Sequence, residues 1–484
     1  MVSLLLLALL GMYHPENWQF FPSMDEVRCI SASVSEVYVA VPTGVCVFDR
    51  PRLRFVRALT VADGLTGEVR LCAHNPSRGD VFIATDGHIH RYVPATGLVE
   101  ELTAPFKNVS SIGIAENGAY FETDAGPYFR ASNALDFNRV SEFPSDLTWY
   151  GGRDTLKPRN FPFLTPYFVT DEQLINHPIT LVRPDKSNKR LFAAVQGYGI
   201  VVYNPRSGFS EGHIRFGPST SGSGLPSSVS HIARVDNRLW FIGGSTAISL
   251  DSTGDWYYFL TRPGDLVTGG FQLLYGNVTS LERDHGLTAI SADSSGLLLG
   301  TTDGIYSLGS NKKLVQLLSL PRQANGLLRL HDSLIFGTDQ GLFLSTRDSA
   351  AEYTDPYGAT NFGVFDIASA GNGTAYFGAI GGIVSRTADG RWFHYVPPGF
   401  DLKQPIRTLA AAGTRVFMAT PSPVPGLPSS VITVLDTKDG SYTTIDASRG
   451  LPVAKINSLY ADDHYLWIAS PGLISRLDYT KELR

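Results

Sequence analysis

Charged residues are scarce in this sequence, and positive charge is not concentrated anywhere along it. Asp, Glu, Lys and Arg make up 18% of the 484 residues, and the formal net charge is −5. A surface that binds nucleic acid needs a basic stripe, and attachment to anionic lipid needs a polybasic segment. We therefore expect neither nucleic acid nor a lipid surface among the partners of this protein.

Cysteine is nearly absent, with three residues that all lie in the first 72 positions, Cys29, Cys46 and Cys72. Their spacing matches no zinc-binding pattern. We expect buried free thiols, and a Cys29–Cys46 disulfide within one small sheet is the alternative if the protein is exported. His88 and His90 share one strand face, but no third ligand accompanies them. The sequence therefore predicts no metal and no other cofactor.

Long apolar runs are missing except at the N-terminus, which reads MVSLLLLALLG. This run has the length of the apolar part of a signal peptide and is too short to span a bilayer. No Lys or Arg precedes it and the cleavage site is poor, so a buried N-terminal strand is the alternative. We assign residues 1–16 as a signal segment and expect a periplasmic or extracellular protein without a membrane span.

The motifs that mark common catalytic sites are missing as well. The sequence contains no HExxH, no phosphate-binding Gly-Lys-Ser/Thr loop and no G-x-S-x-G. Two segments that look similar to the turn box of sialidases, 249–256 and 385–392, have the wrong spacing for it. No local catalytic set is predicted, and we expect a protein that is not an enzyme.

Glycine is abundant, with 48 residues, and it recurs after one repeated strand. This strand is short and apolar, often with an aromatic residue or Leu at its centre, and a Gly turn and an alternating strand usually follow. Ten copies can be aligned, at 36–41, 80–85, 118–123, 190–195, 238–243, 296–301, 333–338, 374–379, 415–420 and 465–470.

A repeat of about 40–45 residues with four strands per copy is typical of β-propellers. The last copy supplies three strands, and NWQFFPS at 17–23 is an isolated apolar strand that can complete it. We therefore predict an all-β domain over 17–484, a β-propeller of about ten four-stranded blades in a single ring closed by the N-terminal strand. Two smaller propellers, or a ring of 7–9 blades, are the alternatives.

The copies also resemble a named family, the two-component regulator propeller repeat. The best of them are GLPVAKINSLYADDHYLWIASPGLISRLD at 450–478 and GLPSSVSHIARVDNRLWFIGGSTAISLD at 224–251. The resemblance implies a propeller like the extracytoplasmic sensing part of hybrid histidine kinases, or like lone exported proteins, some of which belong to the type IX secretion system. No immunoglobulin-like module, membrane helix or kinase follows the last copy, so a lone propeller is expected.

Two long inserts, 144–178 and 261–286, interrupt the repeat and are expected at a rim of the ring. The first interleaves aromatic side chains with Arg and Asp, the chemistry of binding surfaces, although the same aromatics could instead cover the flank or plug the channel. We predict a recognition surface in this insert, formed by Trp149, Tyr150, Arg153, Asp154, Phe163 and Tyr167.

These observations favour a non-enzymatic exported propeller that binds a protein, peptide or glycan partner, within an envelope or secretion assembly or alone. The alternative is a lyase or hydrolase whose active site lies in the central channel, because propeller enzymes gather residues from several blades without a local motif. Three or more titratable side chains converging in one funnel would favour the enzyme. The sequence leaves the ligand and the oligomeric state open.

Overall fold

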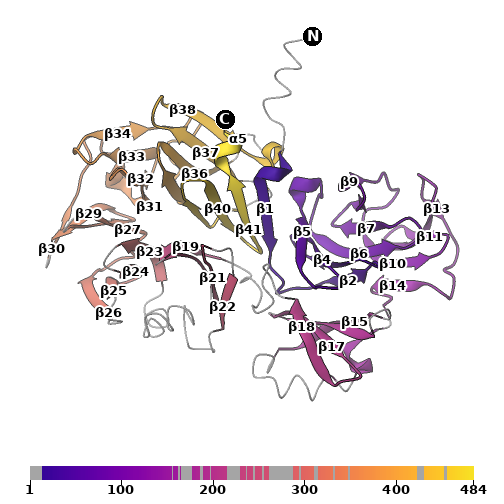
Figure 1. Ribbon diagram of the computed structural model, residues 1–484. Coiled ribbons are helices and arrows are strands. Elements are labelled where there is room, and N and C mark those ends of the chain that lie inside the picture. The colour runs from indigo at the N-terminus through magenta and orange to yellow at the C-terminus, as the bar shows by residue number, and fades with distance from the viewer. Residues whose placement is uncertain are drawn as a thin grey trace, which may run out of the picture. The chain divides into compact units, whose positions relative to one another are not determined.

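The computed structural model consists almost entirely of antiparallel strands (Figure 1). It describes residues 14–483 except for 155, 162–163, 165–176, 186–188, 197, 215–228, 236, 244–245, 253–255, 261–286, 294–295, 310–313, 331–332, 347–348, 422–429 and 452–454. The strands form ten sheets, nine with four strands and one with five. The chain divides into two units, Met1–Gln19 with Ser228–Arg484, and Phe20–Ser227. We refer to them as the six-sheet unit and the four-sheet unit.

Six sheets belong to the first unit. Five of them run from an inner to an outer strand in chain order, and the sixth has the N-terminal strand as its outer strand. Their strands, sheet by sheet, are β19 (His231–Val235), β20 (Arg238–Gly243), β21 (Thr246–Leu250) and β22 (Trp256–Leu260); β23 (Leu287–Asp293), β24 (Gly296–Thr301), β25 (Gly304–Gly309) and β26 (Leu314–Ser319); β27 (Gly326–Leu330), β28 (Ser333–Thr338), β29 (Gly341–Thr346) and β30 (Ser349–Glu352); β31 (Val364–Ser369), β32 (Ala375–Ala379), β33 (Gly382–Arg386) and β34 (Trp392–Tyr395); β35 (Leu409–Ala412), β36 (Arg415–Pro421), β37 (Ser430–Asp436) and β38 (Ser441–Ile445); and β39 (Ser458–Ala461), β40 (Tyr465–Ser470), β41 (Leu473–Asp478) and β1 (Trp18–Pro22).

The N-terminal strand completes the last of these sheets, as predicted. β1 pairs with β41, so the sheet reads β39, β40, β41 and β1 from one edge to the other. Just before and within this strand, Asn17 donates a hydrogen bond to the Glu482 carboxylate at 2.8 Å, and the Trp18 indole N–H donates to the Arg449 carbonyl at 2.9 Å. The strand covers an edge that would otherwise be open to pairing with another chain.

The six sheets close into a ring by themselves. The first sheet, which begins with β19, contacts the last, which begins with β39. The Asn457 side chain donates to the Val229 carbonyl at 3.1 Å, and the Phe241 and Trp467 rings pack edge to face with centroids 5.3 Å apart. Every inner strand therefore has a neighbour on both sides, which is the arrangement of a six-bladed propeller.

The prediction of ten sheets and of the closing N-terminal strand is confirmed, but the prediction of a single ten-bladed ring is wrong. The ten sheets divide into six and four, the alternative of two smaller propellers. The four-sheet unit is, in sequence, an insertion between the outermost strand of the six-sheet ring and its first sheet. One closing strand therefore suffices for the larger ring, and the repeat spacing does not show which sheets are neighbours.

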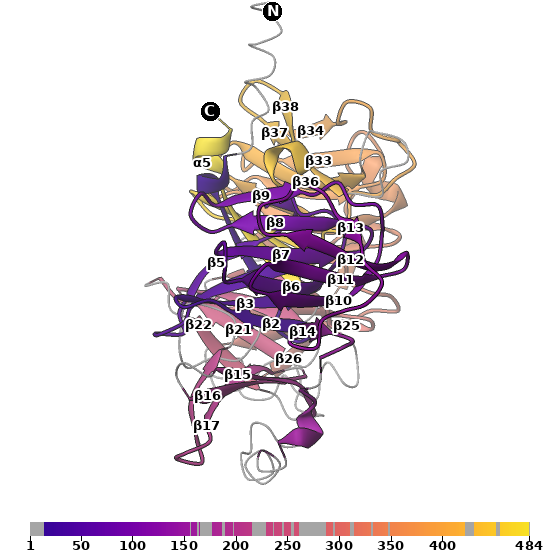
Figure 2. The same ribbon diagram turned by 90° about the vertical axis from the view of Figure 1, so that its right-hand side faces the viewer.

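The four-sheet unit contains the remaining sheets, one of which has a fifth strand (Figure 2). The strands are β2 (Cys29–Ala32), β3 (Glu36–Val41), β4 (Gly44–Asp49) and β5 (Phe55–Leu59); β6 (Val69–Asn75), β7 (Asp80–Thr85), β8 (Ile89–Val93) and β9 (Leu98–Glu101); β13 (Asn138–Arg139), β12 (Gly126–Ala131), β11 (Gly118–Thr123), β10 (Val109–Ala115) and β14 (Thr148–Gly151); and β15 (Ile179–Asp185), β16 (Arg190–Val195), β17 (Gly199–Asn204) and β18 (Phe209–Ile214).

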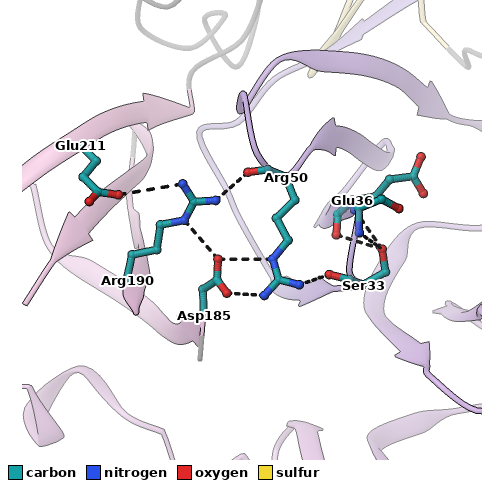
Figure 3. A network of polar contacts seen from close by, with 7 residues as sticks. Ser33, Glu36, Arg50, Asp185, Arg190 and Glu211 are labelled. Atoms are coloured by element: carbon teal, nitrogen blue, oxygen red, sulfur yellow. Dashed lines mark hydrogen bonds and ion pairs between the residues drawn. The ribbon is translucent and has the colours of Figure 1, made fainter. Parts of the chain in front are cut away.

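These four sheets also form a closed cycle of contacts. The first three share one hydrophobic core, in which the Phe82 and Phe121 rings meet edge to face at 5.4 Å. Arg183 of β15 donates to the Trp149 carbonyl of β14 at 3.2 Å, which joins the fourth sheet to the third. Asp185, at the end of β15, forms an ion pair with Arg50 next to the first sheet, and Figure 3 shows this contact within a larger polar network.

Helices are few and short in the described part of the chain. They are η1 (Pro15–Asn17), η2 (Val61–Asp63), η3 (Pro158–Asn160), η4 (Ala359–Phe362), η5 (Ala447–Arg449) and α5 (Tyr479–Glu482). Among the described residues, no helix has both the length and the apolar character required to cross a membrane.

Candidate functional site

A cavity of about 480 Å³ lies at the centre of the six-sheet ring. It is lined by the inner strands of all six sheets, β19, β23, β27, β31, β35 and β39, and by residues just before them. Consecutive residues of each strand border the cavity. Side chains alternate between the two faces of a sheet, so consecutive residues border a space when the edge of the strand lines it. An edge strand presents backbone donors and acceptors. The volume is within the range of roughly 300–1,000 Å³ that is usual for ligand pockets.

Side-chain hydrogen bonds join neighbouring inner strands around this cavity. At one equivalent position in three sheets, a hydroxyl or amide donates to a backbone carbonyl of the first residue of the next inner strand or of the residue two positions before that strand. The donors are Thr288, Asn325 and Asn457, and the acceptors are the carbonyls of Ala324, Val364 and Val229, at 2.5, 3.2 and 3.1 Å. These bonds satisfy polar backbone groups that would otherwise be left unpaired at the edges. They also hold the wall of the cavity in place.

Asp366, on β31, is the acidic residue of this wall. One of its carboxylate oxygens accepts the Leu409 N–H of the neighbouring strand at 2.7 Å, and the other accepts the Ile367 N–H at 2.8 Å. Burial raises the pKa of this carboxyl to about 7, against the opposing effect of the two backbone hydrogen bonds. The group therefore changes its charge near neutral pH.

Gly326 occupies the position equivalent to Asp366 in the preceding sheet, and it has to be glycine because the next strand lies against it. A Cβ placed there would stand 2.7 Å from the Ile367 nitrogen and 2.9 Å from the Ile367 side chain. The Ile367 N–H at this close approach of β27 and β31 donates to the Asp366 carboxylate.

We predict that Gly326→Ala separates these two strands and lowers the free energy of unfolding by about 1–3 kcal/mol, as overpacking does in other cores. Denaturant unfolding followed by fluorescence measures the change. Gly371→Ala is the matched control, because an added Cβ there meets no heavy atom within 4 Å. Equal stability of the two variants would contradict the close approach of β27 and β31.

His231 of β19 also lines the cavity, but both of its ring nitrogens have protein partners. Nε2 lies 3.1 Å from the Thr288 carbonyl and Nδ1 lies 2.9 Å from the Ser230 hydroxyl. A carbonyl can only accept, so Nε2 carries the proton. Burial lowers the pKa of this imidazole, which keeps it neutral at pH 7. These contacts are those of a structural histidine.

Two arginines and two aromatic residues complete the polar wall. The Arg407 guanidinium lies 5.0 Å from the centroid of the Phe365 ring, next to Asp366 in sequence. Arg234 forms a hydrogen bond with Tyr460, which counteracts part of the rise in the pKa of that phenol caused by burial. Five titratable side chains therefore line one cavity: those of His231, Arg234, Asp366, Arg407 and Tyr460. Arg234 and Tyr460 contact each other, whereas the contacts described for the other three are with residues outside this group.

In the four-sheet unit, by contrast, the strand β14 and the residues after it include two residues that were predicted to form the recognition surface. Tyr150 on β14 is 8% exposed and Asp154 is 6% exposed. The Arg183 guanidinium lies 4.3 Å from the Tyr150 ring centroid and donates to the Asp154 carboxylate at 2.6 Å. Both side chains are therefore packed in the interior of this unit.

Trp149 and Arg153 are more accessible members of the same predicted surface. The Arg153 side chain is 47% exposed and pairs with Glu122 at 2.7 Å. Its guanidinium lies 4.8 Å from the Phe143 ring and 5.4 Å from the Trp149 ring, measured to the centroids. The aromatic–arginine stack exists, and its role in binding a partner stays a prediction.

The segment around these residues was expected to stand outside the sheets at a rim, and for 148–151 this expectation is wrong. β14 pairs antiparallel with β10, with Tyr150 opposite Ile112. The apolar side of the segment gains burial in the shared core, and its backbone gains a ladder of hydrogen bonds. Phe163 and Tyr167, and the whole insert 261–286, lie outside the described residues.

The remaining sequence candidates were metal ligands and cysteines. His88 bonds to Glu101 at 2.8 Å and His90 lies 3.1 Å from the Thr66 hydroxyl. Within the described ranges, no three His, Cys, Asp or Glu residues are grouped as metal ligands. Cys29 faces the core that contains Cys72, and its thiol donates to the Cys72 carbonyl at 3.2 Å.

Cys46 cannot be the disulfide partner of Cys29. Cys29 is opposite Ala40 and Cys46 is opposite Val39, so the two thiols point to opposite faces of the same sheet. Burial raises the pKa of the Cys46 thiol, which makes it unreactive. All three cysteines are buried and free in the structure.

The fold and the site together define a β-propeller protein with a polar central cavity. No family model matches the sequence, and no curated protein is significantly similar to it. Among solved structures, the chain is similar to the extracellular domain of the hybrid two-component system BT3049 from B. thetaiotaomicron, with 13% identity, a TM-score of 0.37, and coverage of 94% of this chain and 68% of that one.

It is also similar to PorZ, a surface component of the type-IX secretion system of Porphyromonas gingivalis, with 12% identity, a TM-score of 0.42, and coverage of 93% and 73%. The β-propeller domain of Cps50 (Swd1) from Myceliophteria thermophila matches 63% of this chain and 98% of its own, with 12% identity and a TM-score of 0.35. At these identities and TM-scores, the likeness does not extend to sites or ligands.

Proposed function

We propose that this protein is an exported, non-enzymatic propeller that binds a peptide, protein or glycan partner, and that part of the partner enters the central cavity of the six-sheet ring. The observation that carries the proposal is the cavity itself, about 480 Å³ lined by all six inner strands. In the four-sheet unit, the predicted recognition residues Tyr150 and Asp154 are buried instead. Hydroxyls, amides and strand edges in the wall offer hydrogen bonds to a polar ligand.

The alternative function, a lyase or hydrolase in the channel, is supported by the five titratable residues of the wall. Against it, the contacts of His231 use both ring nitrogens, so the imidazole has no free position for proton transfer. Asp366 then remains as the wall's acid, and glycoside hydrolysis by the usual mechanisms needs a pair of carboxyl groups. Depolymerisation of polysaccharides by the purified protein would support the enzyme and contradict our proposal.

Blocking the cavity tests the proposal. Ala292 borders the cavity and is exposed, so Trp at this position can extend across the opening without displacing packed side chains. We predict that Ala292→Trp weakens ligand binding at least about tenfold, a loss of roughly 1.4 kcal/mol. Ala447→Trp, at an exposed position on η5 in the same unit, is the matched control and should bind like the wild type.

The measurement is a screen of the purified full-length protein on arrays of defined oligosaccharides and synthetic peptides, followed by titration of each hit with both variants. Hits that the control retains and Ala292→Trp loses support a ligand site in the cavity. Hits that bind Ala292→Trp as tightly as the wild type would place recognition elsewhere, with the stack of Trp149 and Arg153 as the next candidate.

A further inference from the structure

Asp366 occupies an unusual position for a carboxylate, because it borders a cavity at the centre of a ring of sheets. Its two hydrogen bonds come from neutral backbone N–H groups of Leu409 and Ile367. A partly buried charge is unfavourable unless an opposite charge lies close to it. The two backbone donors offset part of that penalty and leave lone pairs on both carboxylate oxygens.

The charged and titratable groups on the surrounding elements do not supply that opposite charge. On β35 and the residues before it, Arg407 lies against the Phe365 ring. Across the ring, Arg234 bonds to Tyr460 on β39, and burial keeps His231 neutral. β27 presents Gly326 to this strand and carries Arg329 further along. Burial and the two backbone hydrogen bonds are accordingly the causes that set the pKa of Asp366.

From this placement we infer that the cavity binds a ligand through a primary ammonium group, which pairs with the Asp366 carboxylate. An ammonium carries three donors and a positive charge, so it can use the free lone pairs of both oxygens and provide the missing countercharge. The ammonium can come from an amino sugar or from a lysine side chain. This inference rests on the proposed function, since it names the ligand chemistry of the same cavity.

Binding of an ammonium should then depend on pH in a defined direction. Because the pKa of the free carboxyl is about 7, the ligand must displace a proton from Asp366 below that pH. An alkylammonium stays charged throughout this range, since its own pKa is near 10. We predict that affinity for the amine rises about tenfold per pH unit below pH 7 and levels off above it.

Isothermal titration of the full-length protein with two amine probes tests the inference. Nα-acetyl-lysine N-methylamide represents a lysine side chain and methyl 6-amino-6-deoxyglucoside represents an amino sugar, and the N-acetylated form of each is its neutral control. We expect at least one amine to bind, its acetylated form to bind at least about tenfold more weakly, and the tighter amine to identify the source. If neither amine binds, or the acetylated forms bind as well, the inference is wrong.

Asp366→Asn should lose amine binding and its pH dependence, with Asp463→Asn, at an exposed position in the β39–β40 turn, as the control. Circular dichroism of both variants checks that they fold. Should Asp366→Asn unfold, the pH profile of the wild type still decides. Hits from the arrays that Ala292→Trp loses but that carry no amine would leave the proposed function standing and overturn the ammonium inference alone.

Discussion

Replacing Asp185 with asparagine should lower the free energy of unfolding of the four-sheet unit by about 3–5 kcal/mol, because the change leaves two buried arginines without their shared countercharge. Asp185 is 2% exposed, and Arg50 and Arg190 are 6% and 8% exposed. The Arg50 guanidinium donates to both Asp185 oxygens, and the Arg190 Nε donates to one of them at 3.1 Å (Figure 3). Differential scanning calorimetry and denaturant titration measure the effect.

The surface pair of Arg70 and Asp86 in the same unit provides the control. The Arg70 and Asp86 side chains are 57% and 41% exposed, so Asp86→Asn should change stability by less than about 1 kcal/mol. If Asp185→Asn is as mild as this control, the network does not join the first and fourth sheets. Replacing Arg50, Asp185 and Arg190 together with apolar residues should recover much of the loss, since no buried charge is then left unpaired.

The second large effect is a pH dependence of stability that comes from Asp366. Its pKa is about 7 in the folded protein and 3.8 in the reference state, so between these values the folded state holds more protons than the unfolded state. Stability contributed by this group therefore falls as pH rises through that window. The shift corresponds to at most about 4 kcal/mol, at roughly 1.36 kcal/mol per pH unit, and the partial exposure of Asp366 to solvent reduces this value.

Asp366→Asn isolates this contribution, because the amide does not titrate. We predict that the wild type loses stability relative to the variant as pH rises from 4 to 8. The free energy of unfolding of the variant minus that of the wild type should therefore increase over this range. Guanidinium titrations at intervals of one pH unit provide the profile. A difference that stays constant over this range would show that the carboxyl keeps an ordinary pKa and would contradict the rise of that pKa by burial.

Periodicity determined much of the architecture in advance. The ten repeated strands predicted from Gly turns and aromatic centres coincide with β3, β7, β11, β16, β20, β24, β28, β32, β36 and β40, apart from the terminal residues of two of them. The expected fourth strand of the last sheet is β1. The repeated strands are recognisable from local sequence, and the role of β1 follows because the last repeat lacks a fourth strand. Both features can therefore be predicted from the sequence.

The division into two rings depends on contacts between distant sheets, which a repeat length does not encode. Asn457 and Val229 meet at the closure of the six-sheet ring although 228 residues separate them. The four residues of β14 fall in a segment without repeat spacing, so their pairing with β10 was missed. In both cases tertiary packing decided the outcome.

The residues around the cavity were missed for a related reason. Asp366 stands where other sheets of the six-sheet ring have Ser458, Thr408 or Gly326. Alignment of these six inner strands therefore reveals one carboxylate at a position that is otherwise small or polar. That signal is present in the sequence, yet it acquires meaning only when six inner strands are known to surround one space. The predicted aromatic segment attracted attention by composition, and two of its residues proved to be interior packing.

A crystal structure of the full-length protein with a bound hit from the oligosaccharide and peptide arrays tests the central claim most directly. We predict ligand density inside the six-sheet ring, bordered by all six inner strands and in contact with Asp366. Ligand density on the stack of Trp149 and Arg153, or anywhere outside the ring with the cavity holding only water, would contradict that claim.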